Sequence, residues 1–372
     1  MEVRFDTWKD CFATLPDPRV VGRTSHGLFD ILFLTLCAVI CGMDDWEAIE
    51  EWGRARQDWL RRFVPLENGI PSHDTLARVF AALDSARFEQ CFVRWMSTLI
   101  PSLEGEIVAI DGKTARGSRD RDQAALHMVS AFVCGRGITL GQWKTNEKSN
   151  EITAIPELIE ALDLAGAIVT IDAMGCQKKI AQTIVDRDAD YVFGLKGNQD
   201  TLHAAVQRLF DVTEWQNYAD FADWGHASED VKHGRREQRR CVALPCPAGV
   251  PFDAWKEMKS VVMVESVRQG DGKLTTEKRY FVSSLAPDSK RMAHAIRSHW
   301  EVENRLHWCL DVTFGEDACR IRTDHAPHNL NIVRKIAMNL LRLSPLRKSL
   351  PKKRLRACLS PDYLAQVIGA AT

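Results

Sequence analysis

Two short apolar segments that each end in an aspartate constrain the fold of this chain more than any other sequence feature. Residues 107–110 read IVAI and are followed by Asp111, and residues 168–171 read IVTI and are followed by Asp172. Short β-branched runs bounded by turn residues are typical of buried strands. Helix-like segments lie before and after the second run. This order predicts parallel strands whose ends open on a shared crevice.

The two aspartates would repel each other at neighbouring strand ends unless a cation lay between them. A divalent metal ion is the simplest such cation. Each aspartate also has an ordinary explanation, because Asp-Gly turns such as the one at Asp111 are common where strands end. The repetition of the pattern at Asp172 favours the metal site.

Length and composition limit the class of protein. The chain has 372 residues, enough for more than one folding unit, and its formal net charge of −1 argues against a general polyanion binder. We expect no membrane span, because the apolar run at residues 29–43 is too short and fits a buried helix. The eleven cysteines have no paired CxxC spacing, which predicts reduced core thiols in a cytoplasmic protein rather than structural zinc.

Hydrophobic periodicity and strand patterns divide the chain into consecutive regions. We predict a helical N-terminal domain at residues 1–100 and a mixed α/β region at 101–204. A β-rich insertion follows at 205–285, then a return to the α/β core at 286–345 and a basic tail at 346–372. Three antiparallel strands followed by helix, strand, helix and strand is the order of a ribonuclease-H-like α/β core. In that order the first and fourth strands are neighbours, which places Asp111 beside Asp172.

Positive charge is concentrated near the C-terminus. Residues 290–356 contain fifteen Lys and Arg against six Asp and Glu. Such a cluster either neutralises phosphates or forms a solvated basic surface, and charge alone does not separate the two. The segment 233–240, HGRREQRR, leaves a similar choice between a strand that faces a ligand and an exposed charged edge.

The helical segment at residues 288–311 supplies a third acidic position. At about 100° per residue, Glu303 shares a face with apolar residues, whereas Glu301 points away from that face. A carboxylate on an inner face is costly unless it is paired or binds a metal. Pairing with Arg297 or Arg305 is the alternative to metal binding.

Several longer motifs together carry a family resemblance. The segments AIDGKTARGS, KTNEKSNEITAIPELI, TIDAMGCQKKIA, YVFGLKGNQ, HGRREQR and HWEVENRLHWCLDVTFGEDACRIR occur in the order found in DDE transposases of bacterial insertion sequences. The sequence resembles in particular the ISAs group, which includes proteins associated with H-repeats. The resemblance implies a ribonuclease-H-like core interrupted by a β-rich insertion. It also implies that Asp111, Asp172 and Glu303 hold two Mg²⁺ ions, for which Mn²⁺ can substitute.

The resemblance implies an activity and partners as well. Enzymes of this kind cut the ends of a DNA element and join the 3′ hydroxyls to target DNA by phosphoryl transfer. The expected partners are double-stranded DNA and at least one further copy of the chain, in the bacterial cytoplasm and on the nucleoid. Predicted DNA contacts are Lys113, Lys196, Asn198, Arg235, Arg297, Arg320 and Arg322.

The helper residues of related transposases do not carry over to this sequence. A tyrosine, an arginine and a lysine flank the glutamate in those proteins, whereas Ile296, His299 and Leu310 occupy these places here. Arg297, His307, Arg320 and Arg322 are left open as substitutes. Two other functions also remain open: an inactive or domesticated relative that only binds DNA, and a metal-dependent nuclease or hydrolase. The hydrolase hypothesis uses a different ligand set, formed by His299, His307, Cys309 and Cys319.

Overall fold

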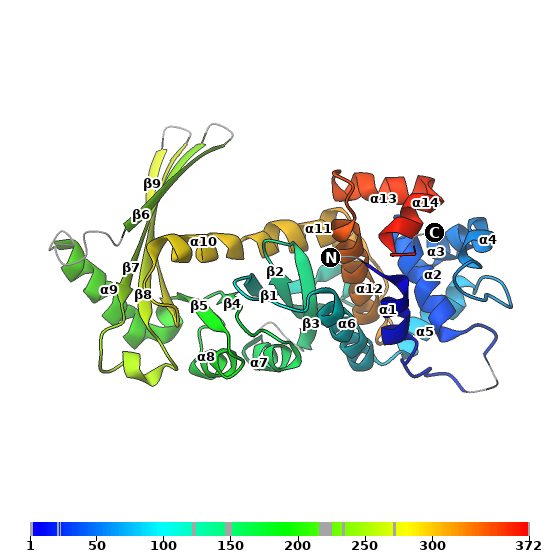
Figure 1. The fold of residues 1–372 in the computed structure, drawn as a ribbon, viewed down its shortest axis with the longest axis horizontal. Coiled ribbons are helices and arrows are strands. Elements are labelled where there is room, and N and C mark those ends of the chain that lie inside the picture. The colour runs from blue at the N-terminus through cyan, green and yellow to red at the C-terminus, as the bar shows by residue number, and fades with distance from the viewer. Residues whose placement is uncertain are drawn as a thin grey trace.

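A computed structural model describes residues 3–20, 22, 24–120, 124–145, 151–215, 225–232, 235–270 and 273–370. The described residues form one nine-stranded sheet with helices at one end and on its faces (Figure 1). The strand order is β3-β2-β1-β4-β5-β9-β8-β7-β6. The strands are β1 (Ile107–Ala115), β2 (Leu126–Val133), β3 (Ile138–Thr145), β4 (Ile168–Ile171), β5 (Asp190–Leu195), β6 (Gly225–Lys232), β7 (Arg235–Pro245), β8 (Ser260–Gly270) and β9 (Lys273–Ser283).

The register of β1 and β4 brings the two predicted aspartates to the same edge. The strands are parallel, and Ile110 pairs with Ile171 at the end of the ladder. Asp172 directly follows β4, whereas Asp111 lies within β1, which continues to Ala115 through its pairing with β2. The prediction that the first strand ends at Asp111 is therefore wrong. The prediction that the first and fourth strands are neighbours is confirmed, as is the antiparallel hairpin of β2 and β3.

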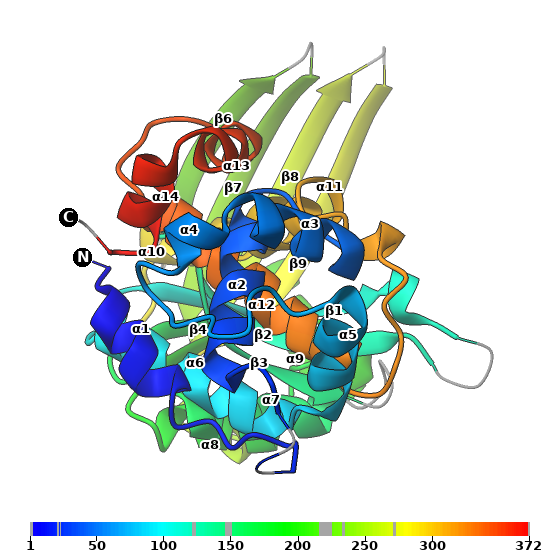
Figure 2. The same ribbon diagram turned by 90° about the vertical axis from the view of Figure 1, so that its right-hand side faces the viewer.

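The four strands β6 to β9 form a long antiparallel arm that rises from the rest of the molecule (Figure 2). Strands were predicted here as a β-rich insertion at residues 205–285. In the structure β9 pairs with β5, so the arm continues the same sheet. This pairing joins strands that are far apart in the sequence, so local patterns do not reveal it.

Helices cover the sheet and build the N-terminal region. The N-terminal helices are α1 (Phe5–Phe12), α2 (Leu28–Ile40), α3 (Trp46–Ala55), α4 (Gln57–Leu60), α5 (His73–Ala82) and α6 (Ser85–Leu99). The sheet helices are α7 (Glu151–Ala161), α8 (Lys178–Val185) and α9 (Asp200–Trp215). Helix α2 is the predicted buried helix, and no helix in the described part of the chain is long and apolar enough to cross a membrane.

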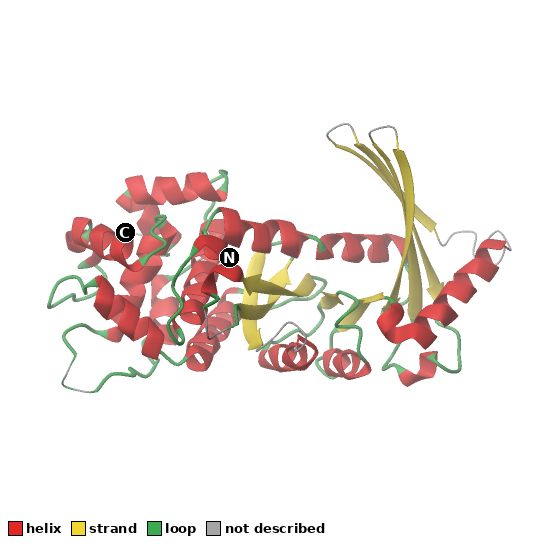
Figure 3. Cartoon of the chain, turned by 180° about the vertical axis from the view of Figure 1, so that it is seen from behind, coloured by secondary structure: helices red, strands yellow, loops and turns green. Residues whose placement is uncertain are grey.

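A long helical rod connects the arm to the N-terminal helices (Figure 3). It consists of α10 (Ser289–His299), a π-helical segment at Val302–His307 and α11 (Trp308–Val312). Helix α12 (Ala326–Leu343) follows and packs against α2 and α6. The helix predicted at residues 288–311 is therefore present, but a π-helical segment interrupts its regular 3.6-residue period.

The basic C-terminal segment is folded rather than a solvated tail. It forms α13 (Leu350–Leu359) and α14 (Pro361–Val367). Lys353 donates to the backbone carbonyls of Leu341 and Ser344, and Arg354 binds the carboxylate of Asp44. Both side chains are buried. Part of the basic cluster therefore fixes the C-terminal helices onto the preceding fold.

The cysteines agree with the predicted core thiols. All eleven lie in the described ranges, none of them forms a disulfide, and eight are buried. Burial raises the pKa of several of these thiols, including Cys134 and Cys176, to about 12. These thiols are therefore protonated at neutral pH and poor metal ligands.

Candidate active site

Asp111, Asp172 and Glu303 line one cavity of about 400 Å³. Asp111 lies on β1, Asp172 follows β4, and Glu303 comes from the π-helical segment of the rod. Strand β5 and the base of the arm complete the wall. The structure therefore brings together three acidic residues separated by up to 192 positions in the sequence.

Asp111 is the most enclosed of the three carboxylates, with 26% of its side chain exposed. Burial raises its pKa to about 6, and the negative charges of Asp172 and Glu151 add to this effect. The backbone N–H of Gly112 and the nearby His307 act in the opposite direction. A carboxylate held in this way gains from a cation, because burial and like charges disfavour its ionised form.

Asp172 lies at the mouth of the same cavity and is exposed. Its Oδ1 accepts hydrogen bonds from the backbone N–H groups of Met174 and Gly175, at 2.9 and 3.3 Å. These bonds are typical of an aspartate that begins a turn. They engage one carboxylate oxygen and leave the other to face the cavity or solvent.

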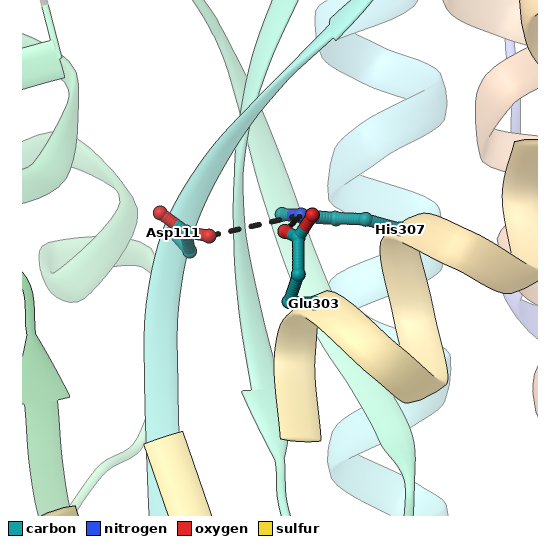
Figure 4. Close-up of side chains that lie close together, drawn as sticks. All are labelled: Asp111, Glu303 and His307. Carbon is teal, nitrogen blue, oxygen red and sulfur yellow. Dashed lines mark hydrogen bonds and ion pairs between the residues drawn. The ribbon is translucent and has the colours of Figure 1, made fainter. Parts of the chain in front are cut away.

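Glu303 and His307 form a close pair beside Asp111 (Figure 4). The Nδ1 atom of His307 is 2.9 Å from Oε2 of Glu303 and 3.7 Å from Oδ2 of Asp111. The hydrogen bond from His307 is the main reason why the pKa of Glu303 is lowered. His307 is buried, and its Nε2 has no hydrogen-bond partner among the described residues. Glu303 remains 60% exposed, so its carboxylate is accessible to a ligand.

The donor atoms fit a divalent metal. Among the described residues, one group of three possible ligands has its atoms within 4.8 Å of one another, and it consists of Asp111, Glu303 and His307. Two carboxylates suit a hard cation such as Mg²⁺, which takes oxygen ligands and keeps several waters. Asp172 lies on the cavity but outside this group, with one oxygen held by its own loop.

The position directly after Asp111, Gly112, has no free space for a side chain. A Cβ atom added at Gly112 would overlap the carboxylate of Glu151 and the ring of His127. Nε2 of His127 is 2.6 Å from Glu151, and its Nδ1 is 2.7 Å from the hydroxyl of Thr114. The glycine is therefore required for packing, and the buried His127–Glu151 pair fixes the strand that carries Asp111.

Lys113, which was predicted to contact DNA, is paired with carboxylates of its own chain. Its ammonium group lies 2.7 Å from Asp311, 2.9 Å from Glu316 and 3.6 Å from Asp317, and only 11% of the side chain is exposed. Lys113 therefore joins β1 to α11 and to the segment that follows it. The sequence showed a lysine next to a catalytic-type aspartate but not its partners, which lie about two hundred residues away in the chain.

The other predicted DNA contacts differ in their surroundings. Lys196 is exposed and lines the cavity, whereas the amide of Asn198 donates to the carbonyl of Ala173 at 2.7 Å. Arg320 is exposed, and Arg322 donates to the carbonyl of Gly117. The side chain of Arg235 lies outside the described residues.

Both arginines proposed as alternative partners of Glu303 bind other carboxylates. Arg297 pairs with Asp230 on the arm at 2.6 Å, and Arg305 pairs with Glu301. The ligand set of the hydrolase hypothesis consists of His299, His307, Cys309 and Cys319. These four side chains do not form a metal-binding group among the described residues. His299 instead contacts Thr170 at 3.0 Å, and burial lowers its pKa, so its imidazole is neutral at neutral pH.

His307 is the residue whose position the sequence reasoning did not establish. It was considered only as a substitute helper or a zinc ligand. Its spacing of four residues from Glu303 is a usable signal, because residues at i and i+4 are neighbours on a helix. The π-helical segment and the proximity to Asp111 are visible only in the structure.

Comparisons with known proteins agree on one family. A model described as "Transposase DDE domain" matches residues 102–340, and one described as "DDE_Tnp_1-associated" matches residues 9–96. The "Putative transposase YncI" of Escherichia coli O157:H7 is 44% identical, over 98% of this chain and 94% of its own. The "H repeat-associated putative transposase YhhI" of Escherichia coli K12 is 41% identical over 96% of each chain. A solved piggyBac transposase synaptic complex with hairpin DNA has a TM-score of 0.45 and 10% identity, over 97% of this chain and 77% of its own.

Proposed function

Because this chain belongs to the family of transposases with a DDE domain, we propose that it cuts the ends of a DNA element and joins them to target DNA. The proposed catalytic carboxylates are Asp111, Asp172 and Glu303. The observation that carries the proposal is their convergence on one cavity from two neighbouring parallel strands and a helical segment. Within this proposal, the five strands β1 to β5 constitute a ribonuclease-H-like core.

The proposed cofactor is a pair of Mg²⁺ ions, with Mn²⁺ as a substitute. Asp111, Asp172 and Glu303 would hold them. The close group of Asp111, Glu303 and His307 supports two of these ligands, and the position of Asp172 on the same cavity supports the third. When bound, such ions activate the attacking oxygen and stabilise the leaving oxygen of the phosphodiester. Replacing one phosphodiester by another requires no external energy source.

The protein side chains orient the reacting groups. Asp111, as the most buried carboxylate, would hold a bound cation at the inner end of the cavity lining. His307 holds the carboxylate of Glu303 toward Asp111 through its Nδ1 atom. His299, neutral because of burial, lines the cavity and can donate or accept a hydrogen bond without adding charge.

Fewer residues are proposed as DNA contacts near the cavity than the sequence predicted. Lys196 lies on the cavity and is suited to bind a phosphate next to the scissile bond. Asn198 supports the loop of Asp172 through Ala173, and Arg320 is an exposed cation further along the chain. Joining two element ends requires at least two copies of the chain on DNA, and such a protein acts on the bacterial nucleoid.

The test is cleavage of a labelled duplex that carries the end of the DNA element encoding the chain. Wild type is compared with Asp111→Asn, Asp172→Asn and Glu303→Gln, with Mg²⁺ and with EDTA. Glu301→Gln is the matched control, because Glu301 lies on the same helical rod and pairs with Arg305. We expect Mg²⁺-dependent cleavage by the wild type and the control, and its loss in the three variants with duplex binding retained.

Other outcomes would change the assignment. Cleavage by Glu303→Gln combined with its loss in Glu301→Gln would move the third ligand to Glu301. Duplex binding without cleavage by the wild type would favour an inactive or domesticated DNA-binding protein. Cleavage without strand joining would favour a metal-dependent nuclease.

A further inference from the structure

A second cavity, of about 540 Å³, adjoins the catalytic cavity. The two cavities share Arg279, Phe281, Ile296 and Trp300 in their lining, so these residues form the wall between them. The second cavity lies between the arm and α10, and four arginines line it: Arg239, Arg268, Arg279 and Arg297. Only this wall therefore separates the arginine-lined second cavity from the proposed site of cleavage.

A carboxylate on the arm forms ion pairs with two of these arginines. Oδ2 of Asp230 on β6 lies 2.6 Å from Nη1 of Arg239 on β7 and 2.6 Å from Nη2 of Arg297 on α10. The hydrogen bond from Arg239 is the main cause of a lowered pKa for Asp230, so the carboxylate is charged at neutral pH. Glu237 on β7 pairs with Arg239 through Oε2 and with Arg268 through Oε1.

These ion pairs contribute little to stability. Arg297 is 49% exposed, and pairs exposed to this degree have a small net effect on folding because water and salt screen them. The geometry is nevertheless specific, because one oxygen atom accepts from two guanidinium groups on different elements. Paired guanidinium groups bind a phosphate oxygen in the same manner as a carboxylate oxygen.

We propose that Asp230 occupies a phosphate-binding site and competes there with the backbone of duplex DNA. This inference rests on the proposed function and adds a binding site formed by Arg239 and Arg297. Without DNA, Asp230 pairs with both arginines, and Glu237 supplies a second negative charge to Arg239. When a DNA strand enters the catalytic cavity, a phosphate of the adjoining segment displaces Asp230 and binds the arginines. The competition weakens binding to duplexes that do not also engage the catalytic cavity.

The neighbouring residue offers a matched control. Glu229 carries the same charge on the same strand, but it points to the opposite face of the arm, where it pairs with Arg236. Asp230→Asn and Glu229→Gln therefore change the net charge of the arm equally. Only Asp230→Asn removes the carboxylate that pairs with Arg297 and one of the two that pair with Arg239.

The experiment measures the dissociation constant of a labelled duplex of random sequence between about 50 and 200 mM salt. We expect Asp230→Asn to bind about three to ten times more tightly than the wild type, as expected for releasing charge-assisted contacts. The slope of the logarithm of the association constant against the logarithm of the salt concentration should become more negative by about one, the value for one further phosphate contact. Glu229→Gln should change both quantities less. Adding Arg297→Gln to Asp230→Asn should remove the gain.

Two outcomes would overturn the inference. If the wild type binds DNA and Asp230→Asn behaves like Glu229→Gln, the competition does not exist while the proposed function stands. A lower melting temperature for Asp230→Asn with unchanged DNA binding would show that Asp230 only holds the arm against α10. If neither the wild type nor any variant binds duplex DNA, the proposed function fails, and the inference fails with it.

Discussion

The Nδ1 atom of His307 lies 2.9 Å from the carboxylate of Glu303, four residues earlier in the π-helical segment of the rod. Short π-helical segments within α-helices often occur at functional sites. The additional residue in this turn allows a buried histidine and an exposed glutamate to face Asp111 together. His307 therefore positions Glu303, and it is also a possible nitrogen ligand of a metal.

Replacing His307 by asparagine should reduce Mg²⁺-dependent cleavage about 10- to 100-fold, the usual effect of removing a residue that orients a metal ligand. The loss should be partly recovered at higher Mg²⁺ concentration, because Glu303 is present but less well oriented. His294→Asn on the exposed surface of α10 is the control. An unchanged dependence on Mg²⁺ in His307→Asn would contradict the positioning role.

The pKa of Asp111 leads to a prediction about stability in the absence of metal. Its value of about 6 lies above the ordinary 3.8, so the folded protein binds more protons than the unfolded chain between these pH values. The stability of the metal-free protein should therefore fall as pH rises through this range. Asp111→Asn removes the cost of keeping a buried carboxylate ionised. In EDTA at about pH 8 this variant should therefore be more stable than the wild type by up to about 3 kcal/mol.

Urea unfolding in EDTA at several pH values would measure this difference. It should nearly vanish at about pH 4, where the wild-type carboxyl is largely protonated in the folded state. Asp172→Asn is the comparison, because Asp172 is exposed and caps its own turn, so its replacement should give no such gain. A wild type that is more stable than Asp111→Asn in EDTA at high pH would refute the prediction.

Gly112 and Gly197 form a matched pair of positions for adding one methyl group near the site. Alanine at Gly112 would overlap Glu151 and His127, whereas a Cβ at Gly197 meets nothing within 4 Å. We expect Gly112→Ala to lower the free energy of unfolding by about 1 to 3 kcal/mol, as is typical of overpacking, and to reduce cleavage. Gly197→Ala should leave stability unchanged. Equal stabilities of the two variants, measured by urea unfolding, would disprove the packing argument.

The sequence anticipated the features that depend on local patterns. Apolar runs ending in Asp111 and Asp172 identified the strands β1 and β4, and the order of elements placed these strands side by side. The end of β1 was placed too early, because this strand continues through Asp111 to Ala115 in its pairing with β2. Glu303 was also found, but counting 100° per residue assumes a regular helix, and the π-helical segment breaks that assumption. Ion pairs across the fold, such as those of Lys113 and Arg297, depend on long-range contacts that one sequence does not encode visibly.

Lys113 and Lys196 should separate stability from DNA binding, because Lys113 is largely buried within β1, whereas Lys196 is exposed directly after β5. Lys113→Met leaves Asp311 and Glu316 without their cation, and it should lower the free energy of unfolding by about 3 to 5 kcal/mol, as for other broken buried pairs. Lys196→Met should keep wild-type stability but weaken binding of duplex DNA and flatten its salt dependence by about one phosphate contact. Urea unfolding and binding titrations on the same preparations would test both expectations. Weaker DNA binding by a stable Lys113→Met variant would restore Lys113 as a DNA contact, and unchanged binding by Lys196→Met would remove Lys196 from that role.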